Sequence, residues 1–319
     1  MTSSLDVLTV GRVGADFYAE QPHASFVNAS RFRKSVGGSP TNVAVAAARL
    51  GRRTAVFTKV GADGLGEYVR YALAEQFGVD TRFVTTHPTL KTPIVVAVMD
   101  PPEDPQFVFY REPRAPDATI EPDEIDAAVV HDVPILWISA GALAVEPSRS
   151  TVRHLLIARK RRRHTILDLD YRPSFWRSEA DARREISATL DAVTAAVGNR
   201  TECAIAVGTD HPEAAADELL ERGLELAVVK MGGEGVLIAS REARTFVPPL
   251  RVQVVSALGA GDAFGGALCH GLLASWTPAK TVEFANAAGA LVASRLLCAD
   301  AMPTEDEVRE LAESQRARG

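Results

Sequence analysis

The chain has few cysteines, and their arrangement gives no ligand or disulfide pattern. Cys203, Cys269 and Cys298 are far apart and odd in number, and no Cys-x-x-Cys sequence occurs. This favours buried thiols in a reducing compartment over a disulfide framework. The seven histidines include no pair at helical ligand spacing, so we expect no built-in zinc site.

Long apolar runs and a basic excess are also missing. No stretch of about 18 uncharged apolar residues occurs, and the amino terminus lacks a basic region with an apolar run behind it. Lys and Arg number 35 against 41 Asp and Glu, a net charge of -6. The one basic run, residues 158–164, falls at the predicted end of a helix, where cations complement the dipole. We therefore expect a soluble cytoplasmic protein with small-molecule partners, no nucleic acid and no membrane.

Two common nucleotide motifs are absent. The sequence contains no Gly-Lys dipeptide, which excludes a P-loop of the Walker type. Residues 259–265 read GAGDAFG, in which the third glycine comes one residue too late for the dinucleotide fingerprint. A nucleotide site in this chain must use another arrangement.

What the chain does contain is an alternation of short apolar strands with amphipathic helices. With 319 residues, 46% of them hydrophobic, it predicts a single α/β domain with a mainly parallel sheet and helices on both faces. Ser39 is the expected cap of the first helix. The last third predicts a hairpin, a further strand at 251–255 and three helices. The expected strands are 54–61, 135–141, 165–170 and 225–232, and the expected helices are 41–51, 65–78, 148–163, 179–192, 263–275, 279–297 and 304–314.

Two early parts of the chain do not fit this alternation. Residues 6–18 with 30–36, and 92–100 with 106–112, have β-branched and aromatic residues at near period two, separated by loop-like sequence. They predict a small antiparallel sheet, formed by segments of about 11–36 and 91–114, that stands off the main one. Such a lid could cover a site at the carboxyl ends of the parallel strands.

Asp262 is the unusual residue of the GAGDAF stretch. Glycines before a helix offer N–H groups to an anion, and a carboxylate there repels a phosphate that is merely bound. An acceptor hydroxyl that attacks a phosphoryl group needs a base beside it, which Asp262 could supply while Gly259, Ala260 and Gly261 stabilise the charge. The alternative is an Asp that only complements the helix dipole.

Three further stretches carry candidate ligand groups. VGGSPTN places a glycine pair before a helix and presents the Asn42 side chain to a ligand. VGNRTE sets Asn199 and Glu202 three residues apart, a spacing that suits a Mg²⁺ water shell. KMGGEG adds a further glycine loop. A helix cap, a solvated turn and a hairpin turn are the alternative interpretations. Lys230, before the last loop, either lies near a nucleotide or points to solvent.

The order of these motifs resembles that of the ribokinase-like (PfkB) carbohydrate kinases along essentially the whole chain. GGSPTN and GAGDAF match the two family signatures, with VGADGLG, NRTE and MGGEG between them. The resemblance implies a three-layer α/β kinase with a β-sheet lid that forms a homodimer contact, and it implies ATP and Mg²⁺ as cofactors. By this resemblance Asp262 is the catalytic base, and the backbone of Gly259, Ala260 and Gly261 forms the anion hole. Asn199 and Glu202 are implied to bind Mg²⁺ and phosphate. The residues implied for the nucleotide are Lys230, Gly232, Gly235, Gly261 and Asn286, and those implied for the sugar are Asp16, Gly38 and Asn42.

GRVGADFY, FYREPRAPD and DLDYRPSFW look most like the 5-dehydro-2-deoxygluconate kinases of inositol breakdown, followed by 2-keto-3-deoxygluconate kinases, with fructokinase a further alternative. An acidic sugar needs a cation for its carboxylate, and a guanidinium binds it bidentately. Arg111 and Arg172 are the candidates, with Arg12, Arg31 and Arg33 as spares; a salt-bridged or surface arginine is the alternative.

The sequence departs from the family pattern just before the glycine loop. Many relatives have Asp-Thr there, and that Asp helps to hold a monovalent cation, whereas this chain has Ser256, Ala257 and Leu258. The departure argues against K⁺ activation. A catalytically silent sugar sensor on the same fold is the non-enzyme alternative, and the intact Asp262 favours the kinase because a sensor needs no base.

Overall fold

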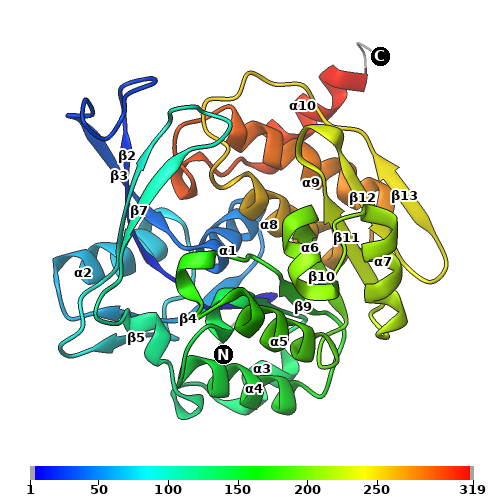
Figure 1. Ribbon diagram of the computed structural model, residues 1–319, viewed down its shortest axis with the longest axis horizontal. Helices are drawn as coiled ribbons and strands as arrows, with labels where there is room; N and C mark the ends of the chain where they lie inside the picture. The colour runs from blue at the N-terminus through cyan, green and yellow to red at the C-terminus, as the bar shows by residue number, and fades with distance from the viewer. Residues whose placement is uncertain (1–3, 317–319) are drawn as a thin grey trace.

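The computed structural model describes residues 4–316 and contains two β-sheets (Figure 1). The larger has nine strands in the order β13-β12-β11-β10-β9-β8-β1-β4-β5. All neighbours from β11 to β5 are parallel, and β12 and β13 are antiparallel, as the predicted hairpin requires. The strands are β1 Val7–Val10, β4 Thr54–Gly61, β5 Val84–His87, β8 Ile135–Ser139, β9 Thr165–Asp168, β10 Ala195–Asn199, β11 Leu226–Lys230, β12 Val236–Ala239 and β13 Arg244–Val247.

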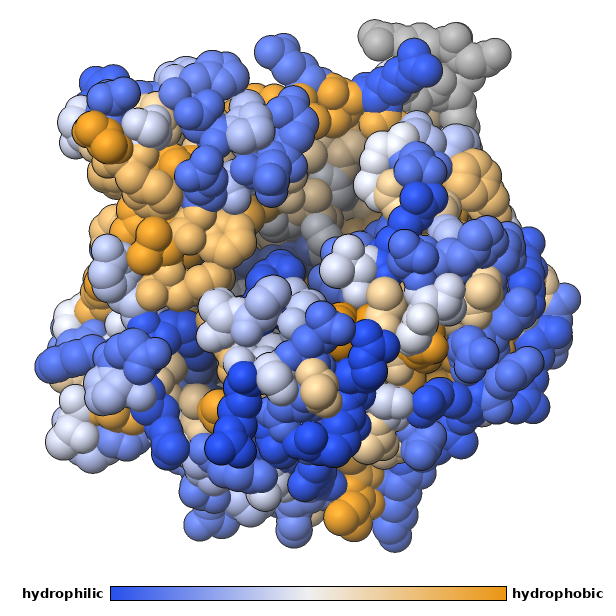
Figure 2. Space-filling view, viewed as in Figure 1, coloured by the Kyte–Doolittle hydropathy of each residue, from blue (hydrophilic) through white to orange (hydrophobic). Residues whose placement is uncertain are grey.

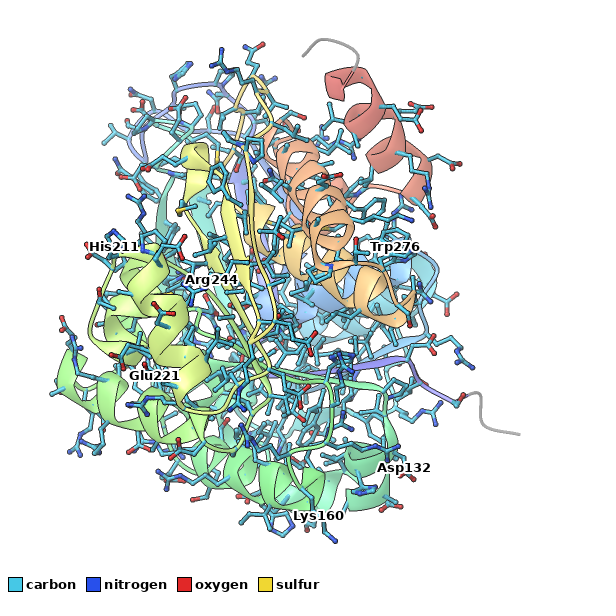
Figure 3. All side chains as sticks on the ribbon, turned by 90° about the vertical axis from the view of Figure 1, so that its right-hand side faces the viewer. Asp132, Lys160, His211, Glu221, Arg244 and Trp276 are labelled. Carbon is cyan, nitrogen blue, oxygen red and sulfur yellow. The ribbon has the colours of Figure 1, made fainter. Side chains whose placement is uncertain are left out.

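Helices cover both faces of this sheet, which confirms the predicted α/β class. Figure 3 shows the sheet between the two groups of helices. One apolar core lies under α1, α2, α8, α9 and α10, and a second lies under α3 to α7. The bounds are α1 Ser39–Arg49, α2 Gly64–Tyr71, α3 Ala127–Asp132, α4 Ser148–Arg159, α5 Glu179–Leu190, α6 Arg200–Val207, α7 Pro212–Glu221, α8 Ala260–Leu273, α9 Pro278–Ala293 and α10 Glu305–Arg316.

The smaller sheet, here called the lid, has four strands in the order β3-β2-β6-β7. Its strands fall inside the two segments predicted for it. The expected antiparallel pairing is wrong in one place, because β2 and β6 are parallel. The expected range 6–18 also spans two sheets, since β1 lies inside the main sheet and only the residues after Gly11 enter the lid. The lid strands are β2 Gly14–Ala19, β3 Phe32–Gly37, β6 Ile94–Val98 and β7 Gln106–Tyr110.

Two local predictions in the rest of the chain are wrong. Residues 251–255 form no strand, although Val255 and Ser256 donate backbone hydrogen bonds to the Ala293 carbonyl at 2.8 and 3.1 Å. The alternating apolar residues of that segment line a cavity instead of joining a sheet. Ser39 does not cap α1, because Gly38 occupies the N-cap and Ser39 is the first helical residue.

The predicted basic run is not a continuous solvated patch. Arg159, the last residue of α4, is fully buried and donates to the carbonyls of Val130, His131 and Val133 among others. The three cysteines are buried and unpaired, as the sequence predicted. Within residues 4–316, no helix is long and apolar enough to span a membrane.

Candidate active site

A cavity of about 1060 Å³ lies between the lid and the carboxyl ends of the parallel strands. Figure 2 shows the hollow beside the apolar lid. Asp168, Asn199 and Lys230 end β9, β10 and β11, and all three line it, as ligand sites of open α/β sheets do. The lid contributes side chains from β2, β6 and β7, and the start of α8 forms part of the wall.

Asp262 lies in the first turn of α8 and faces the cavity. The Nδ2 atom of Asn42 donates a 2.8 Å hydrogen bond to its Oδ2 atom, so the two signature motifs meet here. Gly259 is the N-cap of α8 with a φ of 80°, a left-handed conformation that favours glycine. The first N–H groups of a helix have no intrahelical acceptor, so this end can bind an anion beside the carboxylate.

Burial raises the pKa values of two carboxyl groups in this part of the cavity. The pKa of Asp262 rises to about 6, although the hydrogen bond from Asn42 opposes the shift. The pKa of Asp16 rises to about 7, against the effect of a hydrogen bond from Tyr18. A carboxylate with a raised pKa is a stronger base than one in water, which suits proton abstraction by Asp262 near neutral pH.

Asn199 and Glu202 form a capping box at the start of α6. The Asn199 side chain accepts from the Glu202 N–H at 2.9 Å, and Glu202 accepts from the Asn199 N–H at 2.7 Å. The solvated turn that was the alternative for VGNRTE is therefore a helix cap instead, and both side chains also line the cavity. The second Glu202 oxygen lies 3.7 Å from Arg172 and is an oxygen donor of the kind that Mg²⁺ and its water shell prefer.

The residues predicted for the nucleotide come together along one wall. Lys230 points into the cavity and not to solvent, where the charges of Asp168, Glu202 and Asp262 raise its pKa against the effect of burial. Gly232, Gly235 and Asn286 line the same wall, and Asn286 donates to the Pro248 carbonyl at 2.8 Å. The sugar-side candidates Asp16, Gly38 and Asn42 line the cavity near Asp262.

Three of the five candidate arginines reach the cavity. Arg111 pairs with the buried Asp117, and Arg172 lies 3.2 Å from Asp170. Arg12, named only as a spare, is buried there and pairs with Asp170. The Phe175 ring lies beside both Arg12 and Arg111, 4.6 and 5.2 Å from their guanidinium carbons. Arg31 and Arg33 are exposed on the lid and do not line the cavity.

Sequence reasoning missed the two carboxyl groups at the end of β9. Burial raises the pKa of Asp168 to about 8, and Ser39 donates a 3.3 Å hydrogen bond to it. The adjacent Arg12 and Arg172 instead hold the pKa of Asp170 low despite its burial, and Ser139 donates to it at 2.8 Å. The signal was the DLD sequence, which places two carboxylates where a strand enters the predicted site.

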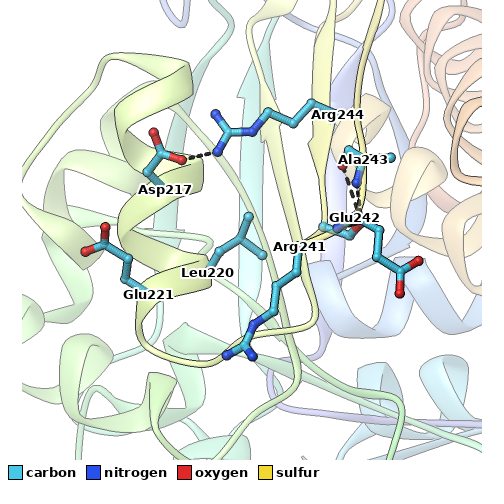
Figure 4. A pocket seen from close by; sticks show the side chains of 8 residues that line it. Asp217, Leu220, Glu221, Arg241, Glu242, Ala243 and Arg244 are labelled. Carbon is cyan, nitrogen blue, oxygen red and sulfur yellow. Dashed lines mark hydrogen bonds and ion pairs between the residues drawn. The ribbon is translucent and has the colours of Figure 1, made fainter.

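A second hollow, of about 500 Å³, lies between α7 and the β12–β13 hairpin (Figure 4). Arg244 spans it and pairs with both Asp217 and Glu213. It is shallow, it is lined by eight residues, and none of the candidate ligand residues of the sequence analysis lies in it. The larger cavity is therefore the candidate active site.

Comparison with known proteins gives one family for nearly the whole chain. The family described as pfkB family carbohydrate kinase matches residues 4–305. A 5-dehydro-2-deoxygluconokinase from Geobacillus thermodenitrificans is 31% identical over 98% of this chain and 94% of its own length. The enzyme of the same name from Photobacterium profundum is 31% identical over 98% of this chain and 96% of its own length.

Solved structures show the same fold. A putative ribokinase II from E. coli, solved in complex with ATP and Mg²⁺, is similar with a TM-score of 0.88 and 22% identity, over 97% of this chain and 99% of that one. A Xylella fastidiosa fructokinase with bound ATP has a TM-score of 0.83 and 24% identity, over 98% and 99%.

Proposed function

Since the chain belongs to the pfkB family of carbohydrate kinases and is thus a sugar kinase, we propose that it phosphorylates a primary hydroxyl of a keto-deoxy sugar acid, 5-dehydro-2-deoxygluconate, to give the 6-phosphate. ATP is the proposed donor. The observation that carries the reaction type is the position of Asp262, which lies at the start of α8 beside Asn42 and has a raised pKa.

In the proposed reaction the acceptor hydroxyl lies between Asp262 and the γ-phosphoryl group. The carboxylate takes the hydroxyl proton while the sugar oxygen forms its bond to γ-phosphorus. The bond from γ-phosphorus to the bridging oxygen breaks, and its electron pair leaves with ADP. The N–H groups around Gly259, Ala260 and Gly261 stabilise charge on the transferred group.

The donor groups near the phosphate end suit Mg²⁺. Asp168 and Glu202 are buried carboxyl groups beside Asn199, and oxygen ligands with retained waters are what this ion prefers. When bound, Mg²⁺ supplies positive charge to the triphosphate. Lys230 supplies a further cation on the same wall. Ser256, Ala257 and Leu258 offer no carboxylate for K⁺, which argues against K⁺ activation, although backbone carbonyls could still bind an ion there.

The arginines support an acidic acceptor. Arg12, Arg111 and Arg172 line the cavity, and each is held by a carboxylate of the protein. Arg172 has 38% of its side chain exposed, against 9% for Arg12 and 18% for Arg111. It is the guanidinium most open to a ligand, and we assign it to the sugar carboxylate.

An ATP-consumption panel tests the proposal. The panel contains 5-dehydro-2-deoxygluconate, 2-keto-3-deoxygluconate, fructose, ribose and nucleosides, and product phosphorus is assigned by NMR. We expect the highest kcat/KM for the first compound and a phosphate ester on its primary carbon. Preference for a neutral sugar or a nucleoside contradicts the substrate assignment and leaves the kinase assignment intact.

We also propose that two copies associate through their lids. Exposed apolar side chains gather on this sheet, among them Phe32, Val108 and Tyr110 (Figure 2). Val108 and Tyr110 lie on the face of β7 opposite to Phe107 and Phe109, which line the cavity. In sedimentation experiments we expect a dimer that Val108→Glu shifts toward monomer; an unchanged sedimentation coefficient contradicts this contact.

A further inference from the structure

Tyr18 lies two residues after Asp16 on β2, so both side chains project from the same face of the lid toward the cavity. Tyr18 is almost fully buried, with 1% of its surface exposed. Its hydroxyl donates a 2.8 Å hydrogen bond to the Oδ2 atom of Asp16. A buried phenol needs an acceptor, and this carboxylate provides one.

The two oxygens of Asp16 have different surroundings. Oδ2 accepts from Tyr18, whereas Oδ1 is buried and has no hydrogen-bond partner among residues 4–316. Ser35 is the partner of Asp16 in the β2–β3 pair, and Gly37, two residues further along β3, leaves room for the carboxylate, because a Cβ atom at position 37 would overlap it. The carboxyl group is thus fixed by the protein on one side and free to accept from a ligand on the other.

The Tyr18 hydroxyl also lies near Cys298, which contacts the loop before α8 that we propose as the anion hole. The Cys298 thiol is a hydrogen-bonding neighbour of this hydroxyl and also lines the cavity. A Cβ atom added to Gly259 would lie 2.8 Å from the Cys298 sulfur, so the thiol and the anion-hole loop are in contact. The thiol and the phenol therefore form a short chain of polar groups that ends on Asp16.

From these contacts we propose that Tyr18 is a positioning residue, whose hydroxyl holds the Asp16 carboxyl group through Oδ2 and turns Oδ1 toward a hydroxyl of the bound sugar. The inference rests on the proposed function, because it needs a sugar in this part of the cavity. It extends that function by naming a residue that governs sugar affinity without touching the reacting atoms.

The charge balance around Asp16 explains why such a partner is needed. Burial and the nearby Asp262 favour its neutral form, whereas the Tyr18 hydrogen bond and the positive charge of Arg12 favour the carboxylate. Cys298 and Tyr68 are the other titratable neighbours; burial is the main reason that the pKa values of both are raised, and the charge of Asp16 adds to it. A neutral Asp16 is a weaker acceptor for a sugar hydroxyl, so loss of the phenol hydrogen bond weakens sugar binding most at low pH.

The test uses Tyr18→Phe in the full chain, with the sugar that the wild-type protein phosphorylates best. We expect the KM for sugar to rise about tenfold, with kcat within about threefold of wild type and nucleotide affinity unchanged. The acid limb of kcat/KM should move about one unit to higher pH. Tyr71→Phe, which removes a phenol hydroxyl from an exposed position at the end of α2, is the matched control and should change none of these values.

A double-mutant cycle separates positioning from a structural effect. In an Asp16→Asn background, Tyr18→Phe should add little, because the hydroxyl acts through the carboxylate. Additive losses, or a Tyr18→Phe protein with wild-type KM and pH profile, overturn the inference. If Tyr18→Phe fails to fold, 3-fluorotyrosine at position 18 keeps the shape and strengthens the donor, and the acid limb should then move to lower pH; no movement overturns the inference.

The outcome is distinguishable from failure of the proposed function. The wild-type panel decides whether the protein is a sugar-acid kinase. The Tyr18 variants are compared with wild type on whichever sugar that panel identifies.

Discussion

Three carboxyl groups with different pKa values line the cavity, of which Asp16 and Asp168 are buried and Asp262 is half-buried. Burial raises the pKa of Asp262 to about 6, of Asp16 to about 7 and of Asp168 to about 8. Each also has its own hydrogen-bond donor, which is Asn42, Tyr18 or Ser39. The same residue type can therefore serve as a base, a hydroxyl acceptor and a group near the phosphate.

Asp262→Asn tests the base. The amide keeps a similar shape but cannot accept the hydroxyl proton, so we expect sugar and nucleotide affinities near wild type and a loss of about 10² or more in kcat. Stopped-flow or coupled assays measure the turnover, and calorimetry measures binding. Unchanged kcat in this variant would mean that Asp262 is not the base.

The wild-type pH profile provides a second measurement of the same group. Because the base acts in its ionised form and its pKa is raised to about 6, kcat should fall as the pH drops through that value. Turnover that stays level down to pH 4.5 contradicts the raised pKa.

Arg172→Ala tests the recognition of the acid. Removal of this guanidinium should reduce kcat/KM for the sugar acid by about tenfold or more, and change it much less for any neutral sugar that is also turned over. Arg177→Ala, an exposed arginine outside the cavity lining, is the control. Equal losses with fructose would favour a neutral-hexose kinase.

At the scale of elements, the site is built where strands and helices end. The β9, β10 and β11 strands end in Asp168, Asn199 and Lys230, and the start of α8 brings Asp262 to the same place. Residues 251–258 connect β13 to α8 and form a wall of the cavity without joining a sheet. The groups that we propose for catalysis and phosphate binding thus come from the ends of strands and helices and from one irregular segment.

Gly259→Ala tests how tightly the backbone before α8 packs against Cys298. Gly259 and Gly51 have almost the same φ, 80° and 79°, so the left-handed backbone alone should cost an alanine about 1 kcal/mol of stability at either position. Only at position 259 would the new Cβ meet Cys298, whereas nothing lies within 4 Å at position 51. We expect Gly259→Ala to lose kcat at least tenfold and Gly51→Ala to keep it, with stability measured by urea unfolding. Loss of turnover in both variants would contradict a local effect on the anion hole.

Much of the arrangement of strands and helices was predictable from the periodicity of apolar residues. The alternation of apolar strands and amphipathic helices predicted the parallel sheet because burial on both faces demands it. Residues 251–255 were wrongly predicted as a strand because their alternating apolar side chains line the cavity. Periodicity shows that one face of a segment is apolar, but it does not show whether that face packs against a neighbouring strand or lines a ligand cavity. The pairing of Arg12 with Asp170 could not be predicted, since the two residues lie 158 positions apart in the chain and meet only in the folded protein.

For the whole molecule, the buried carboxyl groups couple stability to pH. The folded protein retains protons on Asp168 and Asp16 up to about pH 8 and 7, whereas the unfolded chain releases them near pH 4. The stabilisation from raised pKa values is present at low pH and is lost as the pH rises through the folded values. The free energy of unfolding should therefore fall by about 3 kcal/mol between pH 6.5 and 8.5.

Asp168→Asn should flatten this dependence, because asparagine has no proton to release. The exposed Asp210→Asn, in the connection between α6 and α7, should leave the slope unchanged. Chemical denaturation at several pH values measures the slope. A slope that stays at the wild-type value in Asp168→Asn would contradict the raised pKa.

The lid and the anion-hole loop are connected through main-chain atoms. The Ala257 N–H donates a 3.0 Å hydrogen bond to the carbonyl of Pro102, in the turn between β6 and β7. A backbone bond does not depend on side-chain identity, so almost any residue at these two positions preserves it. Proline at position 257 is the exception, because it has no N–H to donate. The side chains of this segment can therefore change during evolution, and its affinity for ions can change with them. The backbone hydrogen bond from residue 257 to the lid is kept through such changes.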